Sequence, residues 1–136
     1  MKLSYPAIFE KWDDGEGYIV TVPDLPGLAT EGDNMAEAIF MAVDAASGYI
    51  LSLLEDGEAV PAASAIKDIK PETDEVVSLI ALDMDSYAAQ YGDAFVRKNI
   101  SIPAWQETFI KKHNLSLSGL MQKTIDSLAD KEKQAV

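Results

Sequence analysis

Residues near the C-terminal end of the chain combine side chains that recognise DNA bases with the spacing of a β-strand. Arg97, Asn99 and Ser101 alternate within FVRKNISI, so on a strand of residues 95–102 they would share one face. Arginine suits the O6 and N7 atoms of guanine, asparagine suits adenine, and serine accepts several partners. Lys98 breaks the apolar alternation of the other face, and its long side chain can extend to a phosphate. A strand that presents these side chains on one face can contact base edges in the DNA major groove.

A short helix is expected directly after this strand. Pro103 suits the first helical position, where its missing amide hydrogen is harmless. The helix should run to about Lys112 and bury Trp105 and Phe109. The apolar face of the preceding strand should enter the core of a dimer through Val96, Ile100 and Ile102.

A second helix follows a tight turn at residues 113–114. Ser116 is its expected N-cap, and Leu115 can pack on Leu120 as a hydrophobic staple. One face of the helix carries Leu117, Leu120, Met121, Thr124 and Leu128. The first amides of the helix would bind a DNA phosphate, and they belong to Leu117, Ser118 and Gly119.

The order of strand, proline, short helix, turn and capped helix resembles the ribbon-helix-helix family. The resemblance covers RKNISIP, AWQETFIKKHN and LSLSGLMQKTIDSLA. It implies a homodimer, because each chain supplies one strand of the ribbon, and it leaves open whether dimers pair into a tetramer. A helix-turn-helix is the close competitor, and an ordinary edge strand with polar residues facing water is the plainer interpretation. The alternating strand before the two helices favours the ribbon form.

The first part of the chain has the pattern of an α+β domain. Strands are predicted at 3–10, 18–22 and 28–31, followed by a helix at 35–55. Pro6 predicts that the first strand lies at a sheet edge or carries a bulge. Asn34 is the expected helix N-cap, with Glu37 completing a capping box.

The remainder of this first part is less regular. Residues 58–75 read as a loop and residues 76–84 as a buried strand, while 86–94 form a short helix or a linker. The chain holds no cysteine, which predicts no disulfide and a cytoplasmic location. We find no signal peptide and no run of about 18 apolar residues, and therefore expect no membrane partner.

The charge is divided unequally along the chain. The net charge of the 136 residues is −12. Residues 1–93 hold four basic and nineteen acidic residues, a net −15, and residues 94–136 hold seven basic and four acidic residues, a net +3. An acidic body attracts basic proteins, whereas a mildly basic tail can approach phosphates. The two parts are thus expected to have different partners, although acidic residues also serve solubility alone.

The segments YPAIFE and GEGYIVTVPDLPGLATEGDNMAEAI resemble the N-terminal domain of HicB-type antitoxins. The resemblance implies a truncated RNase H-like fold at 1–90, an antiparallel sheet plus one main helix, and a ribbon-helix-helix domain at 91–136. It also implies two partners. The first is HicA, a small basic mRNA-cleaving toxin whose active site the antitoxin covers, and the second is the operator of the gene pair.

The residues that could contact such a toxin are less well defined by the sequence. We expect them at the tip of the first hairpin and in the turns that follow, at Trp12, Asp13, Asp14, Glu16, Asp24, Glu31 and Asp33. Trp12 is the type of residue that anchors interfaces, although a tryptophan beside a hairpin is as often part of a core.

Catalysis is not expected. An RNase H-type nuclease needs carboxylates grouped around metal ions, and the candidates Asp24, Glu31, Asp33, Asp83 and Asp85 show no spacing that suggests one site. The single histidine, His113, lies in the turn between the two C-terminal helices. No cofactor or metal is implied. Two alternatives stay open: a ribbon-helix-helix regulator whose first domain senses a ligand or another protein, and a binding module without a toxin.

Overall fold

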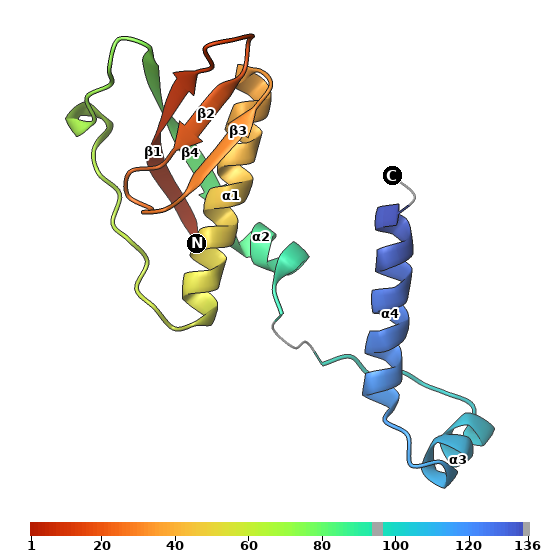
Figure 1. Ribbon diagram of the computed structural model, residues 1–136. Helices are drawn as coiled ribbons and strands as arrows, with labels where there is room; N and C mark the ends of the chain where they lie inside the picture. The colour runs from red at the N-terminus through yellow and green to blue at the C-terminus, as the bar shows by residue number, and fades with distance from the viewer. Residues whose placement is uncertain (94–96, 135–136) are drawn as a thin grey trace. The chain divides into compact units, whose positions relative to one another are not determined.

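The computed structural model describes residues 1–93 and 97–134. The chain forms two compact units, Met1–Ala94 and Phe95–Val136. Figure 1 shows a sheet and a long helix in the first unit and two helices in the second. The first unit is α+β, as predicted, and its sheet is antiparallel throughout.

The sheet of the first unit has four strands in the order β3-β2-β1-β4. They are β1 (Lys2–Lys11), β2 (Tyr18–Thr21), β3 (Ala29–Gly32) and β4 (Glu75–Asp83). The strands predicted at 3–10, 18–22, 28–31 and 76–84 are therefore confirmed to within one or two residues. The prediction that 76–84 is a buried strand holds only in part, since β4 buries Ile80 and Leu82 while Val76 and Leu79 are about half exposed, at 50% and 52%.

The prediction that Pro6 marks an edge strand is wrong for β1 as a whole, since β1 lies between β2 and β4. The physical reason lies in the register. Pairing between β1 and β2 covers only Ile8 to Lys11, whereas Pro6 lies opposite Leu79 of β4. Pro6 thus occupies the half of β1 that pairs on one side, where a missing amide hydrogen is tolerated.

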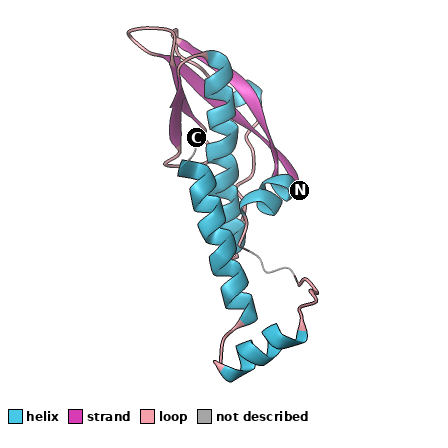
Figure 2. Cartoon of the chain, turned by 90° about the vertical axis from the view of Figure 1, so that its right-hand side faces the viewer, coloured by secondary structure: helices cyan, strands magenta, loops and turns pink. Residues whose placement is uncertain are grey.

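Helix α1 (Met35–Glu55) lies along one face of the sheet (Figures 1 and 2). Its inward face is made of small residues, with Ala38, Ala42 and Ala46 fully buried. A Cβ placed on Gly32 would lie 2.3 Å from the Ala38 amide nitrogen, so glycine is required for this close approach. The helix is long and apolar enough to cross a membrane by length and composition, but its packing is that of a core helix.

The predicted capping of α1 is confirmed. The Glu37 amide donates to Asn34 Oδ1 at 2.8 Å. The Glu37 carboxylate reaches back one residue further than the standard capping box, and accepts the Asp33 amide hydrogen at 3.3 Å. Residues between α1 and β4 contain one short 3₁₀ turn, η1 (Ile66–Asp68).

Helix α2 (Met84–Tyr91) follows β4 without a break, which decides between the two predictions for this segment. Asp83 caps it by accepting the Ser86 amide hydrogen at 3.2 Å. This hydrogen bond is the main reason that the pKa of Asp83 lies below its usual value. Tyr87 and Tyr91 stack with their ring centroids 4.7 Å apart.

The second unit contains α3 (Ala104–Lys112) and α4 (Leu117–Gln134). Both predicted helices are confirmed, with Asn114 in the left-handed conformation (φ 53°) in the turn between them. Residues 97–103 are not a strand in this single chain and are drawn as loop in Figure 2. Residues 95 and 96 of the predicted strand lie outside the described residues. A strand needs a hydrogen-bonded neighbour, and the described part of one chain offers none here.

Candidate functional site

One end of the sheet in the first unit gathers acidic side chains from separate parts of the sequence. The register places Lys11 opposite Tyr18, and Tyr18 opposite Gly32, so the hairpin tip lies beside the start of α1. The same register places Glu10 opposite Glu75. This end, at the top of the sheet in Figure 1, is called here the acidic end. The tertiary structure brings to it Trp12, Asp13, Asp14, Glu16, Glu31, Asp33 and Glu75.

Trp12 has a structural role and also lines a groove. Its ring covers Gly17, where a Cβ would lie 2.3 Å from the ring, and its amide donates to the Gly17 carbonyl at 3.0 Å. The groove beside it is lined by Glu10, Lys11, Trp12, Asp13, Tyr18, Thr73, Asp74, Glu75 and Val76. Asp74 and Glu75 were missed by the sequence analysis, because only the pairing of β1 with β4 shows that they lie next to the hairpin.

Asp24 lies at the other end of the sheet and is already engaged. Its two carboxylate oxygens accept the Ser64 amide hydrogen at 2.9 Å and the Ser64 hydroxyl at 2.7 Å. The Tyr5 hydroxyl donates to the Pro61 carbonyl at 2.6 Å in the same loop. Burial, and secondarily the Asp24 charge, raises the pKa of Tyr5. Asp24 therefore fastens the loop after α1 to the turn after β2.

The predicted DNA-contacting side chains of the second unit are exposed. Arg97, Lys98, Asn99 and Ser101 all face solvent in an irregular segment. The shared face expected of Arg97, Asn99 and Ser101 is not formed in a single chain, since it requires strand geometry.

The start of α4 is capped as predicted. The Gly119 amide donates to Ser116 Oγ at 3.1 Å. This corrects the expectation that the Gly119 amide is free to bind a phosphate, and leaves Leu117 and Ser118 as the candidate amides. Ser118 is exposed, whereas Leu117 is half-buried.

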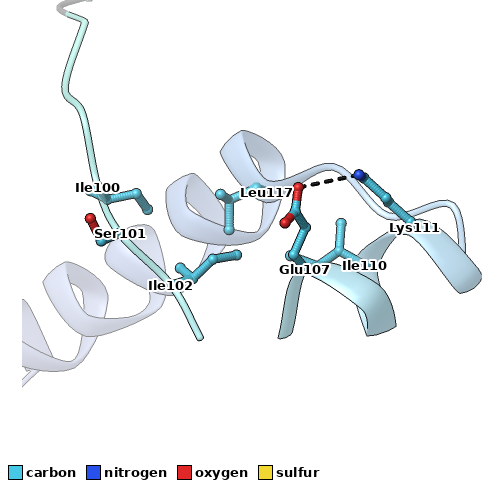
Figure 3. A pocket seen from close by; sticks show the side chains of 7 residues that line it. All are labelled: Ile100, Ser101, Ile102, Glu107, Ile110, Lys111 and Leu117. Atoms are coloured by element: carbon cyan, nitrogen blue, oxygen red, sulfur yellow. Dashed lines mark ion pairs between the residues drawn. The ribbon is translucent and has the colours of Figure 1, made fainter. Parts of the chain in front are cut away.

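Leu117 lines a cavity between the two helices and the segment that precedes them. Figure 3 shows Ile100, Ile102, Ile110 and Leu117 around it, with an ion pair at its rim. That pair joins Glu107 to Lys111 at 3.2 Å. Ser101 also lines the cavity. Ile100 and Ile102 of the predicted apolar face thus lie against the helices, together with Ser101 of the other predicted face, and Val96 lies outside the described residues.

The expectation that the first helix buries Trp105 and Phe109 is wrong for the single chain. Trp105 is 68% exposed and Phe109 is 51% exposed, with His113 stacked on Phe109 at 4.3 Å between ring centroids. The face predicted for the second helix is also uncovered. With Trp105 and Phe109 it forms an exposed apolar face that includes Leu120, Met121, Ile125 and Leu128. Two helices of one chain have too little packing surface to bury these side chains.

Among the described residues, no group of three or more His, Cys, Asp or Glu side chains could hold a metal ion. The first unit has an acidic end, and the second unit has an exposed apolar face. These two features are typical of proteins that bind macromolecular partners. A family model described as the HicB-like antitoxin of bacterial toxin–antitoxin systems matches residues 5–110. The chain belongs to this family. HicB antitoxins are regulatory proteins and not enzymes, so the expectation of no catalysis is confirmed.

Individual relatives agree with the family. Antitoxin HicB 1 of Photorhabdus laumondii is 39% identical over 59 residues, which are 43% of this chain and 37% of that protein. The crystal structure of the Burkholderia pseudomallei antitoxin HicB has a TM-score of 0.55 and 29% identity, with 90% of this chain and 96% of that one covered. A toxin–antitoxin complex from Streptococcus pneumoniae shares the fold, with a TM-score of 0.69, 24% identity and coverage of 96% and 99%.

Proposed function

We propose that the first unit neutralises a HicA-like toxin, a small basic mRNA-cleaving protein, by covering its active site. The observation that carries this proposal is the acidic end of the sheet, where carboxylates of the first hairpin and of the start of β4 line a groove with the half-buried Trp12. Opposite charge steers association and suppresses wrong partners. The Streptococcus pneumoniae protein that shares this fold was solved in a complex with a toxin, which supports a toxin partner.

We further propose that the second unit is a ribbon-helix-helix module that dimerises, binds the operator of its own gene pair and represses transcription. The exposed apolar face of α3 and α4 supports dimerisation, because a second copy would bury it. Arg97, Asn99 and Ser101 contact bases in this proposal, while Lys98 and the helix start at Ser116, Leu117 and Ser118 contact phosphates.

The proposed fold of the first unit is a truncated RNase H-like fold, on the basis of the strand order β3-β2-β1-β4 with α1 on one face. The proposed location is the cytoplasm, where the mRNA and DNA targets of such a gene pair lie. No step of the proposed function uses a cofactor or a metal.

Truncation tests the division of labour. A chain ending at Asp93 keeps the whole sheet and α2, and is expected to rescue growth against the toxin encoded beside it while losing operator binding. Growth assays and gel shifts measure the two activities. Failure of the truncated chain to rescue growth, while the full chain rescues it, would contradict the assignment of neutralisation to the first unit.

Arg97→Ala tests the DNA face. It is expected to weaken operator binding by about 1–3 kcal/mol, the range of one bidentate base contact, and to leave the dimer intact. Operator affinity should also fall steeply with salt, because phosphate contacts release counterions. An unchanged gel shift for Arg97→Ala, or a flat response to salt, would count against the ribbon.

A further inference from the structure

A shallow groove follows the outer edge of β3, away from Trp12. It is lined by Ile19 of β2, by Ala29, Thr30 and Glu31 of β3, and by Met41 of α1. The alternation of β3 places Thr30 on the side of α1 with Val20, and Glu31 on the opposite side with Ile19. Residues from both faces of the sheet thus meet in one groove, which therefore lies along the strand edge. We name it the β3-edge groove.

The backbone of β3 is open on this side. In the described part of the chain, β3 pairs only with β2, so its outward amide and carbonyl groups have no strand partner. An exposed edge is a template for a further strand. Two large apolar side chains flank it, since Ile19 is 41% exposed and Met41 is 40% exposed. Main-chain hydrogen bonds with apolar contacts on either side are the elements of β-strand addition.

The charge around this groove selects the kind of partner. The sequence holds no lysine, arginine or histidine between Lys11 and Lys67. Glu31, Asp33 and Glu37 are exposed beside the groove. A second copy of this unit would bring the same negative charge to the same edge, which is unfavourable. A basic partner is favoured for the same reason.

The other sheet edge is less suited to a basic strand. The 3₁₀ turn η1 lies against β4 and carries Lys67, and the same loop contains Lys70. η1 therefore covers part of the β4 edge, where acidic residues also lie, with Asp68 in η1 and Glu75 at the start of β4. In the described part of the chain no strand pairs with the outer side of β3, and the open backbone beside Glu31 makes β3 the edge where a basic strand is expected to add.

We propose that the toxin docks by adding one of its strands to the edge of β3, with apolar side chains against Ile19 and Met41 and a basic side chain paired with Glu31. This inference rests on the proposed function, since it names the surface and the binding mode for the same partner. It extends the toxin site from the hairpin tip to a strand whose backbone contributes directly.

Hydrogen exchange of the full-length chain tests the added strand. The probe is the toxin encoded beside this chain, prepared with its catalytic histidine replaced by alanine. Outward amides of residues 29–32 are expected to exchange at least about tenfold more slowly in the complex than in the free chain, because they gain hydrogen bonds. A toxin that binds while these amides keep their free-chain rates would overturn the inference and leave the proposed function standing.

Side-chain variants test the flanks of the groove. Glu31→Lys and Met41→Lys are each expected to weaken toxin binding by about tenfold or more, since both place positive charge against a basic partner. Glu58→Lys makes the same charge change as Glu31→Lys just beyond the far end of α1, and should change affinity by less than about threefold. Thermal melting checks that all three variants are folded.

The outcomes separate the two proposals. Equal weakening by Glu31→Lys and Glu58→Lys would show a general charge effect and overturn the β3 assignment. Protection of residues 29–32 in the free chain that rises with its own concentration would identify a second copy as the occupant, and would also overturn it. Absence of any toxin binding by the full-length chain would overturn the proposed function, and this inference with it.

Discussion

The two units of this chain differ in how much of their apolar surface is buried within the single chain. The first unit packs α1 on its own sheet and fully buries large side chains such as Tyr5, Phe9 and Ile50. In the second unit, no residue between 97 and 134 is buried, although Trp105, Ile125 and Leu128 are all large and apolar. The first unit covers its apolar side chains within one chain, whereas the described apolar side chains of the second unit remain exposed.

The same contrast appears in charge. The first unit carries the net −15 and the second unit the net +3. In the proposed function, the strongly acidic unit binds a basic protein, and the mildly basic unit pairs with a second copy on a two-fold DNA site. In the proposed function, a net charge of only +3 leaves much of the DNA affinity to sequence-specific contacts.

The largest expected effect separates the two units by oligomeric state. Ile125→Asp places a charge in the exposed apolar face of α4, where burial by a second copy would be prohibitive. The variant is expected to be monomeric in analytical ultracentrifugation, with melting of the first unit unchanged. Lys123→Asp introduces the same side chain about 160° around α4 from Ile125, at an exposed position, and should stay dimeric. A dimeric Ile125→Asp protein would show that this face is not the dimer interface.

The next effect probes the core of the first unit. Phe9 is fully buried in β1, and Phe9→Ala is expected to destabilise the first unit by about 3–5 kcal/mol through lost burial and a residual cavity. Phe40 lies on α1 with 76% of its surface exposed, so Phe40→Ala should cost less than about 1 kcal/mol. Urea denaturation of both variants measures the difference. Similar losses for the two would mean that Phe9 is not a core residue.

A smaller effect tests the start of α1. Asn34→Ala removes the acceptor of the Glu37 amide hydrogen and is expected to cost about 1 kcal/mol. Asn34→Ser retains a capping oxygen and should recover most of that loss. Thermal melting of the first unit measures both, and equal destabilisation by alanine and serine would argue against the cap.

The smallest effect belongs to the surface of the second unit. Glu107 and Lys111 form an exposed pair one helical turn apart. Glu107→Gln is expected to lower the stability of the dimer by no more than about 0.5 kcal/mol, and the loss should disappear in high salt. Melting at fixed protein concentration in low and high salt measures it. A loss above about 2 kcal/mol would mean that the pair becomes buried between two chains.

The sequence alone determined the local structure, because local structure depends on neighbouring residues. Apolar and β-branched residues predicted the four strands of the first unit within one or two positions, and Asn34, Glu37 and Ser116 predicted the caps, whereas the strand predicted at 95–102 is not formed at 97–102. The sequence-based predictions were wrong where the outcome depended on contacts between residues far apart in the chain. Pro6 suggested an edge strand, yet β1 is central because it pairs with β2 on one side and with β4 on the other. Trp105 was expected to be buried, yet its helix has no neighbour in the same chain that covers it.

The candidate sites divide in the same way. Composition determined that the first part is acidic and the last part mildly basic, and the motifs pointed to the HicB family. Only the tertiary structure decided that Asp24 is used internally to hold Ser64, while Glu75 joins the hairpin tip and Glu31 borders an open strand edge. The physical reason is that charge and periodicity are properties of the chain itself, whereas which carboxylates share a surface depends on strand register.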